Sequence, residues 1–229
     1  MFDSAKIKAV LWDLDDTLYS RRCAAHLTFP GMFKALLYPE KNDSFLQEAA
    51  DYMMTKVHRN SMVPLEAFLQ LTEKYPPEIP FDYDACLAYY YENMYKFARP
   101  AKAPLAVLQN LRTMGIKNAI VTNIPKERTA DQWRKIKALG IETFFDAIVV
   151  SGELDIHKPD RRIFDHAAKL LGVSNEACLF VGDDPLSDIA GARSANMEAV
   201  WLDLRWEDDP FESDAFVHRV RSVTEYFPF

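Results

Sequence analysis

The chain has 229 residues, of which 49% are hydrophobic and 27% charged, and its formal net charge is −7. This length and composition are typical of a globular protein with a sizeable core, built as one elaborate domain or two small ones. The negative charge argues against binding to nucleic-acid polymers or to an anionic membrane surface. The three cysteines, Cys23, Cys86 and Cys178, have no metal-ligand spacing, and the amino terminus lacks the apolar core of a signal peptide. We therefore expect a cytoplasmic protein that is not tied to a membrane.

The first predicted strand ends in a cluster of acids. Residues 9–12 are apolar, as in a buried parallel strand, and Asp13, Asp15, Asp16 and Thr17 follow at once or nearly so. Side chains of an extended segment alternate, which predicts that Asp13 and Asp15 point to one side. The carboxyl ends of strands are where open α/β sheets bind their ligands. The alternative is that these acids only cap the next helix.

After Leu18 the pattern becomes helical for about eighty residues. Three segments space their apolar residues for one helical face, and they cover 43–58, 64–75 and 82–97. These segments predict a small helical bundle, inserted directly after the acid-bearing strand as a lid over the carboxyl edge of the sheet.

From Pro104 onward, helices and strands alternate. Helices are predicted at 105–114, 126–139, 161–171 and 186–195, with strands at 118–122, 147–150, 177–182 and 198–202. Such alternation indicates an α/β protein whose parallel sheet, of at least five strands, lies between helices in a three-layer, Rossmann-like core. We expect this core to comprise 1–17 and 101–229, and the helical cap to comprise 18–100. Residues 216–220 favour an edge strand, and Ser222 with Glu225 resembles a capping box.

Polar residues stand near the ends of three of the later strands of the core. Thr122 and Asn123 end one strand, Lys158 follows the next through a loop, and a further strand leads into Asp183, Asp184 and Asp188. Each has an ordinary structural explanation as a strand end, a solvated loop charge or a helix cap. Since the carboxyl ends of parallel strands share one edge, we expect these groups to meet Asp13 and Asp15 there.

These motifs, in this order, resemble those of the haloacid dehalogenase superfamily. The matching stretches are D-L-D-D-T from Asp13, T-N from Thr122, K-P from Lys158 and G-D-D from Gly182, with Asp188 beyond them. The resemblance implies a Mg²⁺-dependent phosphatase with a helical cap between its first two motifs. It also implies a metal held by Asp13, Asp183 and the backbone carbonyl of Asp15, with Asp188 direct or through water.

Charge leads independently to a cation. Four acids at one pocket, Asp13, Asp15, Asp183 and Asp188, opposed only by Lys158, would leave a charge of about −3. Like charges at close range are costly at low dielectric, and hard oxygen ligands suit Mg²⁺.

The resemblance also implies a role for each group. Asp13 is the expected nucleophile, which forms an aspartyl-phosphate, and Asp15 the expected general acid and base. Lys158 neutralises phosphoryl oxygens and orients Asp13, while Thr122 and Asn123 bind the phosphate with nearby backbone N–H groups. The acid at Asp15 favours a phosphatase over a dehalogenase, because halide displacement needs no leaving-group acid.

The expected substrate is a small phosphorylated metabolite, either a sugar or other organic phosphate or a nucleoside monophosphate. A closed cap excludes water and large polymers. Two alternatives stay open, namely a phosphomutase or phosphonate hydrolase on the same scaffold and a non-catalytic binding or regulatory module. Arg21 and Arg22, in a predicted loop over 19–26, could meet an anionic substrate or simply be solvated, and Tyr89, Tyr90 and Tyr91 could line the pocket.

Three positions depart from the family pattern, each where glycine is usual. They are Ile124, Asp155 and Asn196. Ile124 puts the backbone approach to phosphate in question, whereas Asn196 suits a left-handed conformation that asparagine tolerates.

Overall fold

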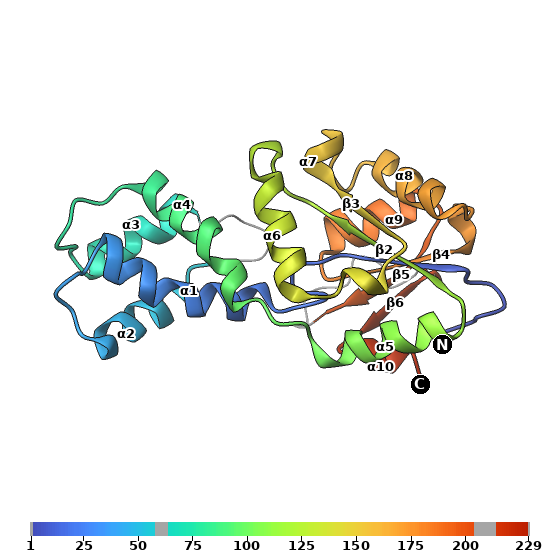
Figure 1. The fold of residues 1–229 in the computed structure, drawn as a ribbon, viewed down its shortest axis with the longest axis horizontal. Helices are drawn as coiled ribbons and strands as arrows, with labels where there is room; N and C mark the ends of the chain where they lie inside the picture. Colours follow the sequence, from blue (N-terminus) through green and yellow to red (C-terminus); the bar gives the residue numbers. More distant parts are fainter. Residues whose placement is uncertain (1, 58–63, 204–213, 229) are drawn as a thin grey trace. The chain divides into compact units, whose positions relative to one another are not determined.

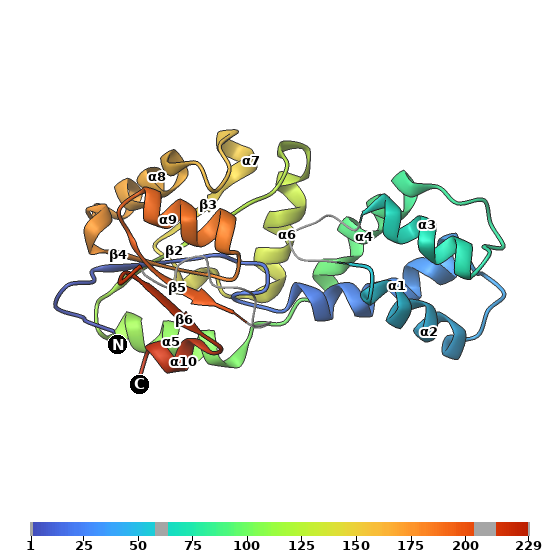
Figure 2. The same cartoon turned by 180° about the vertical axis from the view of Figure 1, so that it is seen from behind.

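The chain forms two compact units in the computed structural model, which describes residues 2–57, 64–203 and 214–228. One unit, Met1–Ser20 with Pro100–Phe229, is an α/β domain, and the other, Arg21–Arg99, is helical (Figures 1 and 2). None of the three cysteines is in a disulfide. Among the helices of the described residues, none has both the length and the apolar character needed to cross a bilayer.

The α/β unit is organised around a six-stranded sheet in which every neighbouring pair is parallel. The strands are β1 (Ala9–Trp12), β2 (Lys117–Thr122), β3 (Ala147–Val150), β4 (Cys178–Gly182), β5 (Glu198–Leu202) and β6 (Val217–Val220). Their order in the sheet is β3-β2-β1-β4-β5-β6. The first strand therefore lies between two neighbours from later in the chain, and the chain proceeds outward from it in both directions.

Helices cover both faces of this sheet, which confirms the predicted α/β fold with flanking helices (Figure 1). One face packs against α8 (Arg161–Leu171) and α9 (Ala190–Ser194), and the other packs against α5 (Lys102–Thr113) and α10 (Val223–Tyr226). Successive side chains of β1 point to opposite faces of the sheet, so each face has its own core. Leu11 packs against α8 on one face, and Trp12 stacks on Phe227 on the other, at a ring-centroid distance of 6.0 Å. The remaining helices and turns of this unit are η2 (Lys126–Arg128), α6 (Thr129–Leu139), η3 (Glu142–Phe144), α7 (Ser151–Leu154), η4 (Asn175–Ala177) and η5 (Pro185–Ile189).

The predicted elements of the α/β unit are present. The strands at 147–150 and 198–202 and the helix at 161–171 have the predicted bounds, while the ends of other elements differ. The expected edge strand is β6, and the expected capping box at Ser222 and Glu225 is formed. The helix predicted over 186–195 is two elements, a π-helical turn at Pro185–Ile189 and then α9. The helix predicted over 126–139 begins as a 3₁₀ turn and becomes α-helical only at Thr129.

The helical unit contains α1 (Arg21–Leu36), α2 (Asp43–Met54), α3 (Leu65–Lys74), α4 (Tyr83–Asn93) and the 3₁₀ turn η1 (Met94–Phe97). The loop predicted over 19–26 is wrong, because α1 begins at Arg21. Pro30 and Gly31 inside this helix concealed it, since both residues disfavour a helix interior. Gly31 permits a close approach to α4, where an added Cβ would lie 3.0 Å from the hydroxyl of Tyr89. The segment predicted to run to 58 ends as a helix at Met54, and 58 itself is outside the described residues.

Two sets of residues suggested for substrate binding have structural contacts inside this unit. The Arg22 guanidinium donates to the carbonyl oxygens of Met54, at 2.9 Å, and Val57, at 3.2 Å, and so satisfies groups at and just beyond the end of α2. Tyr90 is buried against Phe29, while Tyr89 and Tyr91 are half-buried. Arg22 therefore stabilises the bundle, and Tyr90 belongs to its core.

Candidate active site

The carboxyl edge of the sheet places the motif residues next to one another. Trp12 lies level with Ile120 of β2 and Val181 of β4, and the Asp13 N–H continues the ladder by donating to the Val181 carbonyl at 2.9 Å. Two residues beyond Ile120 and Val181 come Thr122 and Asp183. The point at which strand order reverses in a parallel sheet is the usual ligand site of such folds, and here Asp13 occupies it.

The first lysine–carboxylate cluster of the site surrounds Asp13. Lys158 Nζ lies 2.6 Å from Asp13 Oδ1 and 2.7 Å from Asp188 Oδ1, and all three side chains are buried. Asn123 holds the lysine loop, because its Oδ1 accepts from the Lys158 N–H and its Nδ2 donates to the Lys158 carbonyl, both at 2.9 Å. Sequence reasoning gave Asn123 to the substrate, whereas the structure places its side chain on the backbone of Lys158. Lys158 itself lies where the sequence predicted, beside Asp13.

The acids after β4 divide into two roles. Asp184 is a helix cap, since its Oδ1 accepts from the N–H groups of Leu186 and Ser187 at 2.7 and 2.6 Å. Asp188 instead turns back onto the strand and accepts from the Asp184 N–H at 3.1 Å. Gly182 makes room for it, because a Cβ there would lie 2.3 Å from Asp188 Oδ2. The capping explanation is therefore correct for Asp184 and does not account for Asp188.

The arrangement of three acids fits a divalent cation. One carboxylate oxygen from each of Asp13, Asp183 and Asp188 lies within 4.8 Å of the other two, and all three residues are buried. Grouped carboxylates in a low-dielectric site repel one another, and hard oxygen donors are the ligands that Mg²⁺ prefers. The Asp15 side chain is not part of this group.

The electrostatics of Asp13 also call for a further positive charge. Burial raises the pKa of Asp13 to about 7, because desolvation outweighs the attraction of Lys158, and the charge of Asp188 adds to the rise. Burial alone would lower the pKa of Lys158, but the carboxylates of Asp13 and Asp188 raise it above its usual range. A nucleophilic carboxylate must be ionised, and a bound cation would favour that form.

A second buried lysine, which the sequence analysis missed, contacts Asp15. Lys135 Nζ lies 2.8 Å from Asp15 Oδ1 and 3.1 Å from Asp15 Oδ2. Gln132, one turn earlier on α6, donates to Thr122 Oγ1 at 2.6 Å and to Asp15 Oδ2 at 3.2 Å. Because Thr122 accepts this bond, its own hydroxyl hydrogen can be donated elsewhere, as phosphate binding requires. In the sequence, the one indication of this role is that Gln132 and Lys135 are three residues apart and so share one face of the helix.

The three departures from the family pattern have local explanations. Asp155 and Asn196 both adopt positive φ, 54° and 62°, so these sites do use the conformation that favours glycine. The left-handed conformation expected of Asn196 is confirmed. The Ile124 N–H donates to Ser151 Oγ at 2.9 Å and is thereby engaged within the protein.

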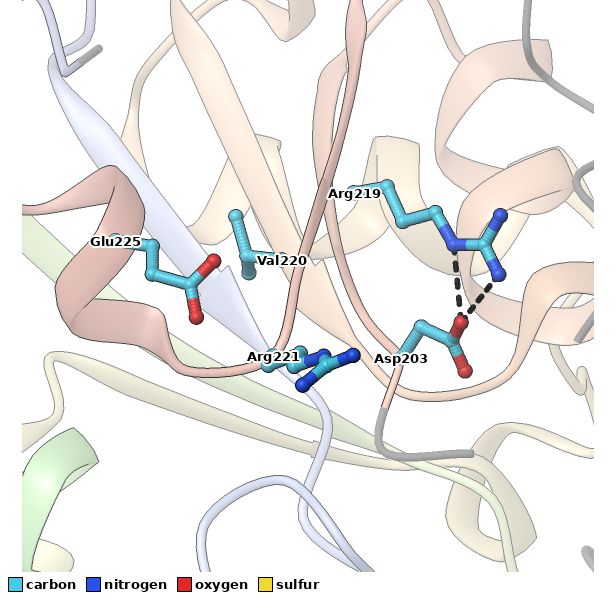
Figure 3. Close-up of a pocket in the computed structure, with 5 residues that line it drawn as sticks. All are labelled: Asp203, Arg219, Val220, Arg221 and Glu225. Atoms are coloured by element: carbon cyan, nitrogen blue, oxygen red, sulfur yellow. Dashed lines mark hydrogen bonds and ion pairs between the residues drawn. The ribbon is translucent and has the colours of Figure 1, made fainter. Parts of the chain in front are cut away.

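A pocket of about 320 Å³ lies farther along the sheet, at the ends of β5 and β6. Its lining includes Asp203, Arg219, Val220, Arg221 and Glu225, and Figure 3 shows the Arg219 guanidinium turned onto the Asp203 carboxylate. Those two groups make hydrogen bonds of 2.9 and 2.6 Å. Arg219 also lies over the ring of Trp201, whose indole N–H donates to the Asp183 carbonyl at 3.1 Å. This region therefore supports the backbone of Asp183.

Comparison with known proteins agrees with this geometry. A model of the haloacid dehalogenase-like hydrolases matches residues 7–196. A glyceraldehyde 3-phosphate phosphatase of Methanopyrus kandleri is 32% identical over an alignment 229 positions long that covers 96% of each chain. A phosphoserine phosphatase of Thermus thermophilus is 38% identical over 120 residues, 52% of this chain and 47% of that one. Among solved structures, the HAD-hydrolase YfnB of Bacillus subtilis, bound to magnesium, has a TM-score of 0.74 at 20% identity, covering 97% of this chain and 98% of that one.

Proposed function

The chain belongs to the haloacid dehalogenase-like hydrolases and is a phosphatase of phosphate monoesters, and from that premise we propose that it transfers the phosphoryl group to Asp13 before releasing it to water. The observation that carries this proposal is the buried contact of 2.6 Å between Asp13 and Lys158 at the end of the central strand. A carboxylate fixed in this way can attack phosphorus in line with the leaving oxygen.

In the first step, an oxygen of Asp13 bonds to phosphorus while the bond from phosphorus to the leaving oxygen breaks. Asp15 gives its proton to that oxygen, because an alkoxide is a poor leaving group. Lys158 stabilises negative charge on the phosphoryl oxygens, and the Thr122 hydroxyl donates to one of them. In the second step, water attacks phosphorus, Asp15 takes the proton from that water, and the bond to Asp13 breaks to regenerate the carboxylate.

Mg²⁺ is the proposed cofactor. Asp13, Asp183 and Asp188 would hold it through their side chains and Asp15 through its backbone carbonyl. When bound, the ion would reduce the repulsion between the carboxylate of Asp13 and the dianionic phosphoryl group. The grouping of three buried carboxylates supports this assignment.

The proposed substrates are small phosphorylated metabolites. The relative that matches along nearly its whole length is named for glyceraldehyde 3-phosphate, and the relative that matches over about half is named for phosphoserine. Short phosphorylated aldehydes, polyols and hydroxy acids are therefore the first compounds to test, followed by nucleoside monophosphates. The helical unit, Arg21–Arg99, is the proposed cap that selects among them.

The test is phosphate release from a panel of these compounds, with Mg²⁺ and with excess chelator. We expect activity only with the metal, and a loss of at least about 10³-fold in the Asp13→Asn variant, because an amide cannot form the covalent intermediate. Thermal melting would check that the variant is folded. Activity that survives Asp13→Asn would reject the assigned nucleophile.

A further inference from the structure

Helix α6 presents two polar side chains to the interior of the α/β unit. Gln132 is fully buried and Lys135 is 6% exposed, although the next lysine on this helix, Lys137, is exposed. An ammonium group is seldom enclosed unless it is paired, because desolvation of a charge is costly. The placement of Lys135 therefore depends on its partners.

Those partners form a closed hydrogen-bonded network around Asp15. Lys135 donates to both oxygens of Asp15 and, at 2.9 Å, to Gln132 Oε1. Gln132 in turn donates to Thr122 and to Asp15, and the hydroxyl of Tyr19 donates to Asp15 Oδ1. Donors from three side chains thus fix the plane of one carboxyl group, and the same glutamine fixes the hydroxyl of Thr122.

Stability alone is a weak explanation for this network. A buried ion pair is often no more stabilising than well-packed apolar side chains of the same volume. The pair is also asymmetric, since the Lys135 side chain is 7% exposed and that of Asp15 is 24% exposed. The enclosed lysine therefore leaves its carboxylate partner partly open, at the same edge of the sheet as Asp13.

We propose that Gln132 and Lys135 are positioning residues for Asp15, which rests on the function proposed above. Lys135 holds the carboxyl group by hydrogen bonds while Asp15 passes a proton to the leaving oxygen. Gln132 is hydrogen-bonded to both Asp15 and Thr122. It therefore fixes the distance between the acid that protonates the leaving oxygen and the hydroxyl that binds a phosphoryl oxygen. Neither residue needs to contact the substrate.

The experiment compares two aryl phosphates of nearly the same shape whose leaving groups differ in acidity. Phenyl phosphate needs a proton donor for its leaving oxygen, whereas 4-nitrophenyl phosphate releases a stabilised anion. The measured quantity is kcat/KM, which reports transfer of the phosphoryl group to Asp13. We expect Lys135→Met to lower it about 10- to 100-fold for phenyl phosphate and less than about 3-fold for 4-nitrophenyl phosphate. Gln132→Met also loses the bond to Thr122 and should lower it for both substrates, with the larger loss on phenyl phosphate.

Matched variants separate positioning from folding. Lys137→Met removes the same charge from the exposed side of α6 and should change neither substrate's kcat/KM. Lys135→Arg keeps a cationic donor and should recover part of the loss on phenyl phosphate. If Lys135→Met does not fold, Gln132→Met and Lys135→Arg carry the same comparison.

Equal losses on both substrates, or no loss on either, would overturn the positioning role. A wild-type protein that hydrolyses neither compound with Mg²⁺ would instead reject the proposed phosphatase mechanism. The two failures are distinguished by the wild-type measurement alone.

Discussion

Two lysine–aspartate contacts lie at the same sheet edge, and they are built differently. In the first, Lys158 and its partners Asp13 and Asp188 have side chains that are 2%, 8% and 1% exposed. In the second, the Lys135 side chain is enclosed but that of Asp15 is 24% exposed. A nucleophile benefits from a rigid, desolvated setting, whereas an acid that exchanges protons with a leaving group and with water must stay accessible. The difference in exposure matches the difference in the proposed roles.

The largest effect should come from breaking the enclosed pair. Lys158→Met leaves the carboxylates of Asp13 and Asp188 without their shared cation and removes charge stabilisation from the phosphoryl oxygens. We expect kcat/KM for 4-nitrophenyl phosphate to fall about 10³-fold, because this loss does not depend on the leaving group. Steady-state kinetics would check it, with Lys137→Met as control and thermal melting as the test of folding. A Lys158→Met enzyme that is impaired only on phenyl phosphate would contradict the difference proposed between the two lysine–aspartate contacts.

The accessible acid gives the second prediction. Asp15→Asn keeps the shape of the side chain but cannot supply the proton, so kcat/KM for phenyl phosphate should fall about 10²-fold and that for 4-nitrophenyl phosphate much less. Asp16→Asn is the matched control, since asparagine suits the positive φ of 60° at that position and no change is expected. Similar losses on the two substrates would remove Asp15 from the role of general acid.

The third prediction concerns the glycine beneath Asp188. In Gly182→Ala the added methyl group would displace the Asp188 carboxylate, because a Cβ at this position would lie 2.3 Å from Asp188 Oδ2. We expect the Mg²⁺ concentration for half-maximal activity to rise roughly tenfold, as for changes that disturb ligand orientation. Gly172→Ala, at a positive φ with open space around it, should lower stability by about 1 kcal/mol without changing the Mg²⁺ requirement. An unchanged Mg²⁺ requirement in Gly182→Ala would argue against Asp188 as a ligand.

The smallest expected effect is on stability, and it concerns Glu198, at the start of β5 and away from the carboxyl edge of the sheet. Glu198 accepts hydrogen bonds from His218, Lys6 and Tyr226, and these lower its pKa from the usual 4.5 to about 2 against the opposing effect of burial. Because the folded-state pKa is below the unfolded one, the stabilisation is present above about pH 4.5 and is lost as the pH falls toward 2.

Glu198→Gln should therefore lower the free energy of unfolding by about 1–3 kcal/mol at pH 7, with kcat/KM unchanged. The difference from wild type should shrink as the pH falls below about 4.5, and urea titrations at several pH values would measure it. Exposed Glu176→Gln is the control, for which no such trend is expected. A difference that grows toward low pH would contradict the assignment.

The site residues that stand at the carboxyl ends of strands could be predicted from the sequence. Asp13, Thr122 and Asp183 could be placed together because parallel strands bring their carboxyl ends to one edge, and Lys158 could be added through its family motif. Lys135 could not, because a lysine within a charged helix reads as a solvated residue until the packing of that helix is known. Residue type and spacing alone did not separate Asp184 from Asp188, since both are acids near a helix start. The family motif singled out Asp188, and the turn geometry then identifies Asp184 as the cap.

The central claim is that Asp13 carries the phosphoryl group between two steps. Rapid acid quenching of the wild-type enzyme during turnover of 4-nitrophenyl phosphate with Mg²⁺, followed by proteolysis and tandem mass spectrometry, tests it most directly. We expect one phosphoryl group on Asp13 in the wild-type protein and none in Asp13→Asn. Phosphoryl transfer to another residue, or steady turnover with no phosphorylated peptide in a quench time course that includes the first turnover, would contradict it.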